Sequence, residues 1–176
     1  PPDAGGLDTD FLQGVGGEPR HVPHDDVAIA TGTGGTARWL PYSPSGNAVN
    51  VFEATRPHSP LGCEVDVFDV KHLNLGLEAA EQHFVVYAAC CLEADKDTEC
   101  ELRMSTVDDS WKIYVDHEPL GDYSPMRGAP DANGPRVRLE KGRHLVLVKL
   151  AGTKLPPGAG HVGVFVFSLR VTDPSG

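Results

Sequence analysis

Strict alternation of apolar and polar residues in one segment limits what this chain can fold into. In the segment ECELRMS, residues 99–105, Cys100, Leu102 and Met104 alternate with charged or polar residues. Successive side chains of a strand point to opposite faces of its sheet, so this period of two predicts a strand with one buried face. No segment keeps the apolar stripe at i, i+3 and i+4 that a globular helix requires. The sequence therefore predicts an all-β fold.

Short apolar segments separated by turn-forming residues extend this pattern along the chain. The strongest is FVVYAACCLE at 84–93, apolar on both faces, as expected for a strand inside a sandwich. Other candidate strands lie at 27–30, 111–115, 143–150 and 162–171. Roughly eight to ten strands at this spacing predict an antiparallel β-sandwich, either a jelly roll or a related Greek key.

The length favours one domain. At 176 residues the chain is near the usual domain size, and we predict a single β-sandwich domain over 1–176. Residues 1–26 are rich in glycine, proline and charge and predict a mostly irregular segment packed on the sandwich, pinned by Phe11 and Leu12. A short helix from Asp8 to Gly14 is an alternative for part of it.

Charge and hydropathy limit the partners. Twenty-five acidic against fifteen basic residues give a net charge of −10, which repels nucleic acid and anionic lipid, and the sequence shows no local basic patch. The longest apolar stretches, Phe84 to Leu92 and Val162 to Phe167, are shorter than the ~20 residues of a membrane helix. We expect a soluble chain with no nucleic-acid partner and no membrane insertion. Its start at Pro1, without methionine, is expected of an excised or processed fragment.

The cysteines leave two alternatives. The chain has four: Cys63, Cys90, Cys91 and Cys100. They lack the paired spacing of zinc or redox sites. If Leu92 pairs with Glu99 across the turn 93–98, Cys91 lies opposite Cys100 and within reach of a disulfide. Buried thiols packed as small hydrophobic side chains are the other possibility.

One segment resembles a known family. TECELRMSTVDDSWKIYVDHEPL resembles the central hairpin of protective-antigen-type lectin domains and of related jelly-roll modules appended to bacterial polysaccharide-degrading enzymes. RVRLEKGRHLVLVKLAG and FVFSLRVTD are similar to their closing strands, and GGLDTDFLQGVGGEP to their leader segments. The resemblance of the hairpin and closing strands covers about residues 84–173. It implies a carbohydrate-binding accessory module that is secreted, in an extracellular or periplasmic location.

Two residues depart from the family pattern. Ser110 replaces the glycine after the acidic pair, and Asp116-His117 replaces an Asn-Gly or Asp-Gly turn. Glycine is favoured in that turn because both positions need a positive φ. We expect the substitution to lengthen the turn through Glu118 and Pro119 and to shift what the loops present.

The resemblance also implies a calcium site. It assigns Asp108 and Asp109 as calcium ligands that also reach sugar hydroxyls, with Asp131 or Asn133 as further ligands. Carboxylate and amide oxygens suit this hard cation. From the residues alone, the alternative is that Asp108 and Asp109 simply make the turn, since aspartate bonds its own backbone.

Aromatic residues are candidates for sugar stacking. Trp39 and Trp111 offer flat faces to the C–H surface of a sugar ring, and Tyr114 assists, as do Tyr42 and Tyr123. Trp111 also fits the core, because it alternates with the apolar residues that follow it in its strand.

A compact histidine and aspartate cluster has two interpretations. His21, His24, Asp25 and Asp26 carry nitrogen and oxygen atoms that suit a transition metal, whereas a solvated loop is the simpler interpretation.

Catalytic motifs are missing from the sequence. It has no Gly-x-Ser-x-Gly, no His-Glu-x-x-His and no phosphate-binding loop. We expect a non-catalytic module that binds polysaccharide or glycan through its loops or a concave sheet face, with calcium assistance. A structural or docking domain of a larger multidomain protein is one alternative. A jelly-roll polysaccharide lyase or hydrolase is another, since scattered carboxylates can meet in three dimensions.

Overall fold

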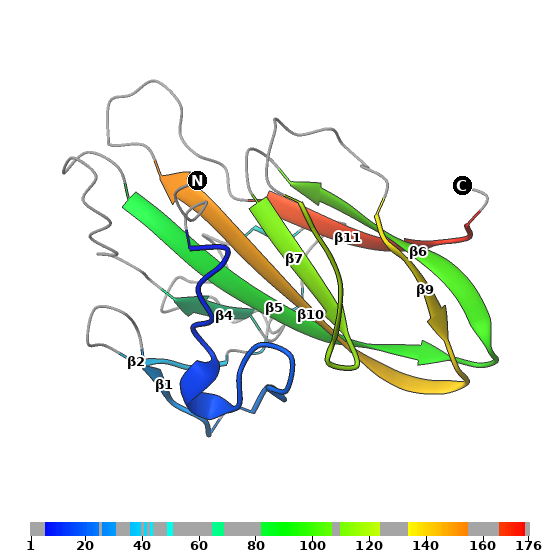
Figure 1. The fold of residues 1–176 in the computed structure, drawn as a ribbon, viewed down its shortest axis with the longest axis horizontal. Coiled ribbons are helices and arrows are strands. Elements are labelled where there is room, and N and C mark those ends of the chain that lie inside the picture. The colour runs from blue at the N-terminus through cyan, green and yellow to red at the C-terminus, as the bar shows by residue number, and fades with distance from the viewer. Residues whose placement is uncertain are drawn as a thin grey trace.

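The computed structural model confirms an all-β fold (Figure 1). It describes residues 6–24, 26–30, 36–39, 41, 43, 49–50, 65–68, 82–106, 110–123, 134–154 and 166–174. Within these residues lie one 3-10 turn, η1 (Gln13–Val15), and eleven strands. The strands are β1 (Ile29–Ala30), β2 (Thr36–Ala37), β3 (Val49–Asn50), β4 (Val65–Phe68), β5 (Gln82–Ala94), β6 (Thr98–Thr106), β7 (Ser110–Val115), β8 (Glu118–Tyr123), β9 (Arg136–Leu139), β10 (Gly142–Lys154) and β11 (Val166–Thr172).

The strands form two main antiparallel sheets. One has five strands in the order β4-β5-β10-β7-β8, and the other has four in the order β3-β11-β6-β9. A two-stranded sheet of β1 and β2 lies beside them. The long strands β5 and β10 pair along their whole length, from Ala94 opposite Gly142 to Gln82 opposite Lys154 (Figure 1). The antiparallel sandwich expected from the sequence is therefore present.

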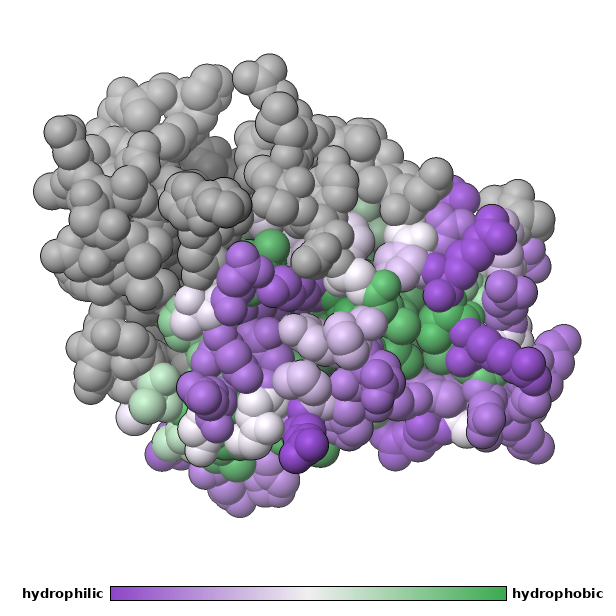
Figure 2. All heavy atoms as spheres, viewed as in Figure 1, coloured by the Kyte–Doolittle hydropathy of each residue, from purple (hydrophilic) through white to green (hydrophobic). Residues whose placement is uncertain are grey.

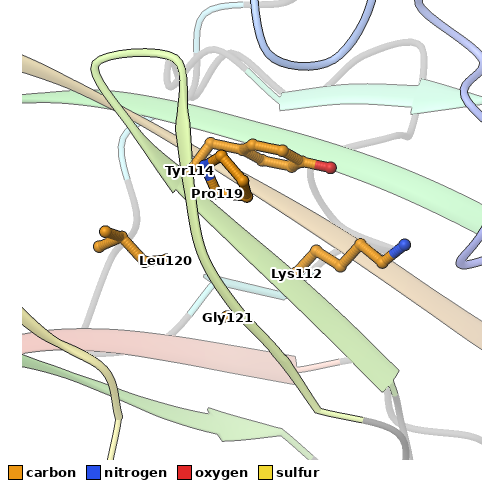
Figure 3. Close-up of a pocket in the computed structure, with 5 residues that line it drawn as sticks. All are labelled: Lys112, Tyr114, Pro119, Leu120 and Gly121. Carbon is orange, nitrogen blue, oxygen red and sulfur yellow. The ribbon is translucent and has the colours of Figure 1, made fainter.

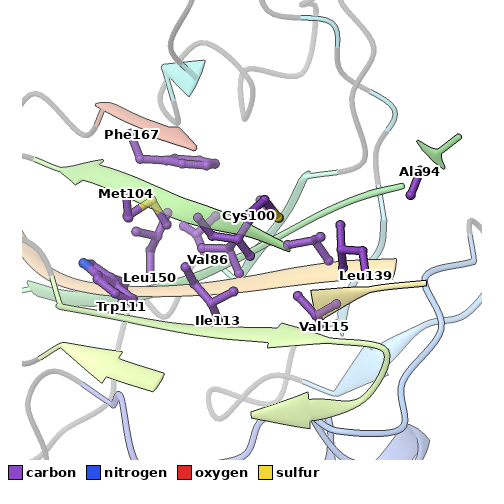
Figure 4. Close-up of a cluster of buried hydrophobic side chains, with 14 residues drawn as sticks. Val86, Ala94, Cys100, Met104, Trp111, Ile113, Val115, Leu139, Leu150 and Phe167 are labelled. Carbon is purple, nitrogen blue, oxygen red and sulfur yellow. The ribbon is translucent and has the colours of Figure 1, made fainter. Parts of the chain in front are cut away.

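The main core lies between the two sheets (Figure 4). From β6 it takes Cys100, Leu102 and Met104, each at most 5% exposed, as their alternation predicted. The five-stranded sheet contributes alternate residues, among them Trp111 and Ile113 from β7. Burying an aliphatic or aromatic side chain of this size contributes about 1.5–3 kcal/mol, so this layer supplies much of the folding free energy.

A second apolar layer covers the outer face of the five-stranded sheet. Leu7, Leu12 and Trp39 pack there against the outward side chains of β5, including Val85 and Tyr87. Leu12 is fully buried, as its predicted role in pinning the N-terminal segment requires. Residues 6–24 therefore form a cover over this sheet.

The N-terminal segment forms a single 3-10 turn instead of the short helix considered from Asp8 to Gly14. The Asp10 carboxylate accepts the backbone N–H of Leu12 at 2.9 Å and that of Glu18 at 3.1 Å. These bonds compete with helical pairing. The turn then ends at Gly16, which has a φ of +114° that favours glycine.

The disulfide considered between Cys91 and Cys100 is wrong. The two strands that carry them belong to different sheets, because the chain crosses from one layer to the other after Ala94. Cys91 lies opposite Leu145 and Cys100 opposite Val137, and both are thiols. Burial raises the pKa of the Cys100 thiol, whereas Cys90 and Cys91 are exposed. Cys63 lies outside the described residues.

The turn between β7 and β8 is not lengthened, so that expectation is also wrong. Asp116 and His117 alone connect the strands, with φ of 48° and 75°. Aspartate tolerates this left-handed region, and here its carboxylate accepts the Leu145 N–H at 2.9 Å. The hairpin has a β-bulge in β8 instead, where Leu120 has no paired residue in β7.

The surface is mostly hydrophilic in the view of Figure 2, with hydrophobic atoms showing between the β7–β8 hairpin and β9. β8 and β9 are edge strands of the two sheets, so hydrophobic side chains near the core reach the surface between them. Among the described residues, no helix has the length and apolar character needed to cross a membrane.

Candidate functional site

A hollow of about 310 Å³ lies against the β7–β8 hairpin (Figure 3). Its lining residues are Lys112, Tyr114, Pro119, Leu120 and Gly121. Lys112 and Tyr114 extend to one side of β7 because they alternate with the core residues Trp111 and Ile113, whereas Leu120 extends to the other side (Figure 3). Tyr114 lies opposite Pro119 in the strand register. Strand alternation therefore places Lys112 and Tyr114 on one side of the hairpin, and the bulge turns Leu120 to the other.

A charged pair borders the hollow. The Lys112 Nζ lies 2.8 Å from Asp8 Oδ1 in the N-terminal segment. The Lys112 side chain is 19% exposed and that of Asp8 is 70% exposed. The hydrogen bond and charge of Lys112 lower the pKa of the Asp8 carboxyl. The pair thus presents an ammonium group that donates hydrogen bonds and an ionised carboxylate that accepts them. Together they match a hydroxyl group, which both donates and accepts hydrogen bonds.

Pro119 and the edge of the buried Tyr114 ring give the hollow a small apolar wall. The Tyr114 hydroxyl donates to Glu18 Oε2 at 2.6 Å, which fixes the ring, and the residue is 7% exposed. Pro119 is exposed on the neighbouring strand. A rigid aromatic edge beside a proline ring costs little conformational entropy when a ligand packs on it.

A buried ion pair anchors this wall from beneath. Glu18 is 5% exposed and Lys149 is fully buried, with the Lys149 Nζ 2.6 Å from Glu18 Oε1. Lys149 also donates to the carbonyls of Leu7 at 2.8 Å and Thr9 at 2.5 Å. Every charge here faces an opposite charge or a strong acceptor, as a buried ion requires. The cluster ties the N-terminal segment to β10 and β7.

Tyr87 completes the cluster, and its phenol remains protonated. Its hydroxyl donates to Glu18, and its ring lies 5.6 Å from the Lys149 Nζ. Burial and the Glu18 carboxylate raise the pKa of Tyr87 far above its ordinary value. The phenol therefore stays protonated and serves as a hydrogen-bond donor.

The sequence gives little sign of this cluster. Glu18 and Lys149 are separated by 131 residues. The one local signal is Lys149 itself, a charged residue inside the apolar segment 143–150 at a position whose neighbours in the alternation are buried. A lysine there needs a partner.

His21 is neither a metal ligand nor part of a solvated loop. Its Nε2 accepts the Trp39 Nε1–H at 2.6 Å, and its Nδ1 faces the Val15 carbonyl at 3.4 Å. Burial lowers its pKa, so the imidazole is neutral with the proton on Nδ1. Both nitrogens are thus engaged, whereas His24 is exposed at 3.8 Å from Asp26.

No metal-binding cluster of three histidine, cysteine, aspartate or glutamate residues occurs within the part of the chain that the structure describes. Asp25 lies outside that part. The calcium ligands implied by the resemblance also lie outside it: Asp108, Asp109, Asp131 and Asn133.

The structure separates the predicted aromatic residues. Trp39 is 2% exposed under the N-terminal segment, and Trp111 is 5% exposed in the main core. Neither indole offers a face to a ligand, because apolar neighbours cover both. Tyr114 is in the hollow, beside Lys112, which sequence reasoning did not select. Tyr42 and the Tyr123 side chain lie outside the described parts.

Comparison with known proteins gives remote likenesses. No protein-family model and no curated protein sequence matches the chain. The PA14 domain of the antifreeze protein MpAFP is 9% identical with a TM-score of 0.42, over 89% of each chain. A PA14 sugar-binding domain from an RTX adhesin is 14% identical with a TM-score of 0.38, over 82% of this chain and 83% of that one.

An enzyme shows a more partial likeness. A beta-glucosidase from Kluyveromyces marxianus in complex with glucose is 15% identical with a TM-score of 0.38. The matched part is 52% of this chain but only 10% of the enzyme chain. The class of fold, an antiparallel β-sandwich, therefore rests on the strands of this chain itself.

Proposed function

We propose that this chain is a non-catalytic carbohydrate-binding module and that a sugar ring rests in the hollow at the β7–β8 hairpin. The observation that carries the proposal is the small apolar wall of Pro119 and the Tyr114 ring edge beside the Asp8–Lys112 pair, in which Asp8 is 70% exposed and Lys112 19%. A sugar ring has C–H faces that pack on such a wall and hydroxyls that both donate and accept. The sequence resemblance to lectin-type modules favours the same ligand class.

The carboxylates beside the hollow support a binding role over a catalytic one. Glycoside hydrolysis needs one carboxylic acid kept protonated near a second carboxylate. Lys112 instead lowers the pKa of Asp8, which favours the ionised form, and Glu18 is buried and engaged by Lys149 and two tyrosines. Neither is suited to donate a proton to a leaving group.

Calcium is part of the proposal. Asp108 and Asp109 directly precede β7, the strand that presents Lys112 and Tyr114. Their carboxylates, with Asp131 or the Asn133 amide, form a donor set that suits calcium. When bound, the cation would supply direct coordination of sugar hydroxyls.

The partner and location follow from the same proposal. A polysaccharide or glycan outside the cell or in the periplasm is the ligand, and the module holds it near a polysaccharide-degrading enzyme. The docking-domain alternative requires a large exposed apolar patch. Among the described residues, the exposed large hydrophobic side chains are Val22 and Val171, at 61% and 47%. The hydrophobic area between the β7–β8 hairpin and β9 is the feature in Figure 2 that would favour this alternative.

Affinity electrophoresis in gels that contain neutral or charged polysaccharides tests the site. We expect the wild type to be retarded by at least one polysaccharide, and Lys112→Ala to weaken that binding about tenfold, the equivalent of about 1.4 kcal/mol. Lys141→Ala, an equal charge change in the turn before β10, is the control and should bind like wild type. Absence of retardation across the panel contradicts the binding role, and release of reducing sugar contradicts the non-catalytic one.

A further inference from the structure

A buried contact between two rings holds the N-terminal segment to the residues that follow β2. The rings of His21 and Trp39 are stacked, with their centroids 5.5 Å apart and their planes 15° from parallel. The Trp39 Nε1–H donates to His21 Nε2 at 2.6 Å. His21 is 3% exposed and Trp39 is 2% exposed, so water reaches neither ring freely.

This hydrogen bond fixes the protonation state of His21. An indole nitrogen can only donate, so Nε2 of the imidazole must carry a lone pair. The single ring proton lies on Nδ1, which faces the Val15 carbonyl oxygen at 3.4 Å. A second proton would set an N–H against the Trp39 N–H and would place a charge in a buried site. The closed segment therefore accepts only the neutral imidazole.

The charged groups nearby do not cancel this penalty. Burial is the largest influence and lowers the pKa of the imidazole, whereas the charge of Asp10 acts in the opposite direction. Arg20 and Arg38, which adjoin the two rings in sequence, are exposed cations. On the side of the sheet, Glu18 and Lys149 balance each other at 2.6 Å. The net effect disfavours a charged imidazole under the closed segment.

The same segment carries two groups that build the hollow at the β7–β8 hairpin. Asp8 lies 2.8 Å from the Lys112 Nζ. Glu18 accepts the Tyr114 hydroxyl at 2.6 Å and so fixes that ring. If the segment opened, the hollow would lose its carboxylate and the support of its aromatic edge.

We propose that the His21–Trp39 contact is an acid-sensitive switch of the hollow: protonation of His21 opens the N-terminal segment and removes Asp8 from beside Lys112. The open segment exposes the imidazole to water, where it carries a charge at little cost, whereas the closed segment excludes the charged form. Acid therefore shifts the population toward the open form. The effect on a bound glycan rests on the proposed function, but the opening itself does not.

The direction of the pH dependence follows from the two forms of the segment. In the closed form the pKa of His21 lies below its ordinary value of 6.5. Opening therefore takes up a proton below pH 6.5. Its equilibrium constant rises by up to about tenfold for each pH unit until the pKa of the closed form is reached. The segment is held most firmly above pH 6.5.

Hydrogen exchange of the free protein, followed by mass spectrometry, tests the switch without a ligand. From about pH 7.5 to about pH 5.5, the opening constant of residues 6–19, corrected for the intrinsic pH dependence of exchange, should rise about three- to tenfold in wild type. His21→Gln keeps an acceptor for the Trp39 N–H but takes up no proton, so its opening constant should rise less than about twofold. His24→Gln, at an exposed histidine of the same segment, is the matched control and should respond like wild type.

A second variant keeps the test decisive if His21→Gln loosens the segment at every pH. Trp39→Phe removes the indole N–H but keeps an aromatic ring, so its response to acid should be smaller than that of wild type. No rise in wild type, or an equal rise in wild type and His21→Gln, would overturn the switch. Retardation of wild type by a polysaccharide, together with a segment that ignores pH, would contradict the switch alone. Opening in acid without retardation by any polysaccharide would contradict only the glycan-binding role.

Discussion

His144 is held between two acceptors at the start of β10. Its Nδ1 lies 2.5 Å from Asp116 Oδ2 and its Nε2 lies 2.7 Å from the Glu140 carbonyl oxygen. Both ring nitrogens face acceptors, an arrangement that only the doubly protonated imidazolium satisfies. The hydrogen bond to Asp116, followed by that to Glu140, accordingly raises the pKa of His144. The residue fastens the β7–β8 turn to β10.

This contact should make stability depend on pH. The folded pKa of His144 is raised above its ordinary value of 6.5, so its stabilisation is fully present below that value and is lost as pH rises through the folded pKa. We expect the difference in unfolding free energy between wild type and His144→Gln to shrink as pH rises in that range. Urea unfolding at a series of pH values measures it. A difference that stays constant or grows with pH would contradict the proposed protonation.

Gly134 shows a second constraint at a single residue. The chain passes over β6 so closely that a Cβ on Gly134 would lie 1.3 Å from the Leu102 carbonyl oxygen. The same contact region includes the hydrogen bond from Leu102 N–H to the Pro135 carbonyl at 3.0 Å. The clash is with backbone, which cannot move aside as a flexible side chain can.

Gly134→Ala should therefore lower the free energy of unfolding by about 1–3 kcal/mol or more, the usual effect of overpacking. Gly14→Ala is the control, because nothing lies within 4 Å of a Cβ at that position. Urea denaturation of both variants measures the difference. Equal stability of the two would mean that the segment at Gly134 does not hold this close approach in solution.

At the scale of elements, the N-terminal segment is attached to the sheet by both apolar and ionic contacts. The sequence predicted the apolar part through Phe11 and Leu12, an adjacent hydrophobic pair in a polar segment, and Leu12 is fully buried. The ionic part was not predictable, since nothing local links Glu18 to Lys149. Only the pairing of β10 with β5 and β7 brings Lys149 under this segment.

Removing one member of this ion pair should be costly. We expect Lys149→Met or Glu18→Gln to lower the free energy of unfolding by roughly 3–5 kcal/mol, because each leaves a buried group without its partner. The double variant should lose less than the sum of the two, as coupled groups do. Lys112→Met is the control, because its partner Asp8 is 70% exposed and ion pairs with solvent-exposed members contribute at most about 1 kcal/mol. Additive losses in urea unfolding would show that the pair is not coupled.

At the scale of the whole molecule, local patterns predicted the strands but not their partners. The alternation at residues 99–105 and the apolar segment at 84–93 both form strands, as expected. The alternative in which the two strands pair as one hairpin was wrong. Alternation fixes which face of a strand is buried but not which strand lies beside it. The Cys91 and Cys100 disulfide was wrong for that reason.

The candidate sites show the same limit. Trp39 has a flat aromatic ring of the kind that stacks on sugars, yet the fold buries it beneath the N-terminal segment. Side chains from separate strands can also gather on one face without any local signal in the sequence. The sequence shows no basic run, and Arg103, Arg136, Arg138 and Arg170 share one face only because β9, β6 and β11 pair in one register. Surface chemistry built from separate strands is invisible until that register is known.

Calcium binding affects the stability of the molecule as a whole, because a ligand that binds only the folded state raises its stability by mass action. If Asp108 and Asp109 hold calcium, addition of the ion at about a hundred times its Kd should stabilise the fold by about 2.7 kcal/mol. We expect a higher melting temperature with calcium than with a chelator, and no such shift in Asp108→Asn/Asp109→Asn. Magnesium should shift it less, because it demands a smaller octahedral site. Identical melting curves for wild type in calcium and in chelator would contradict the calcium site. The two carboxylates would then serve only to form hydrogen bonds to the backbone of a turn.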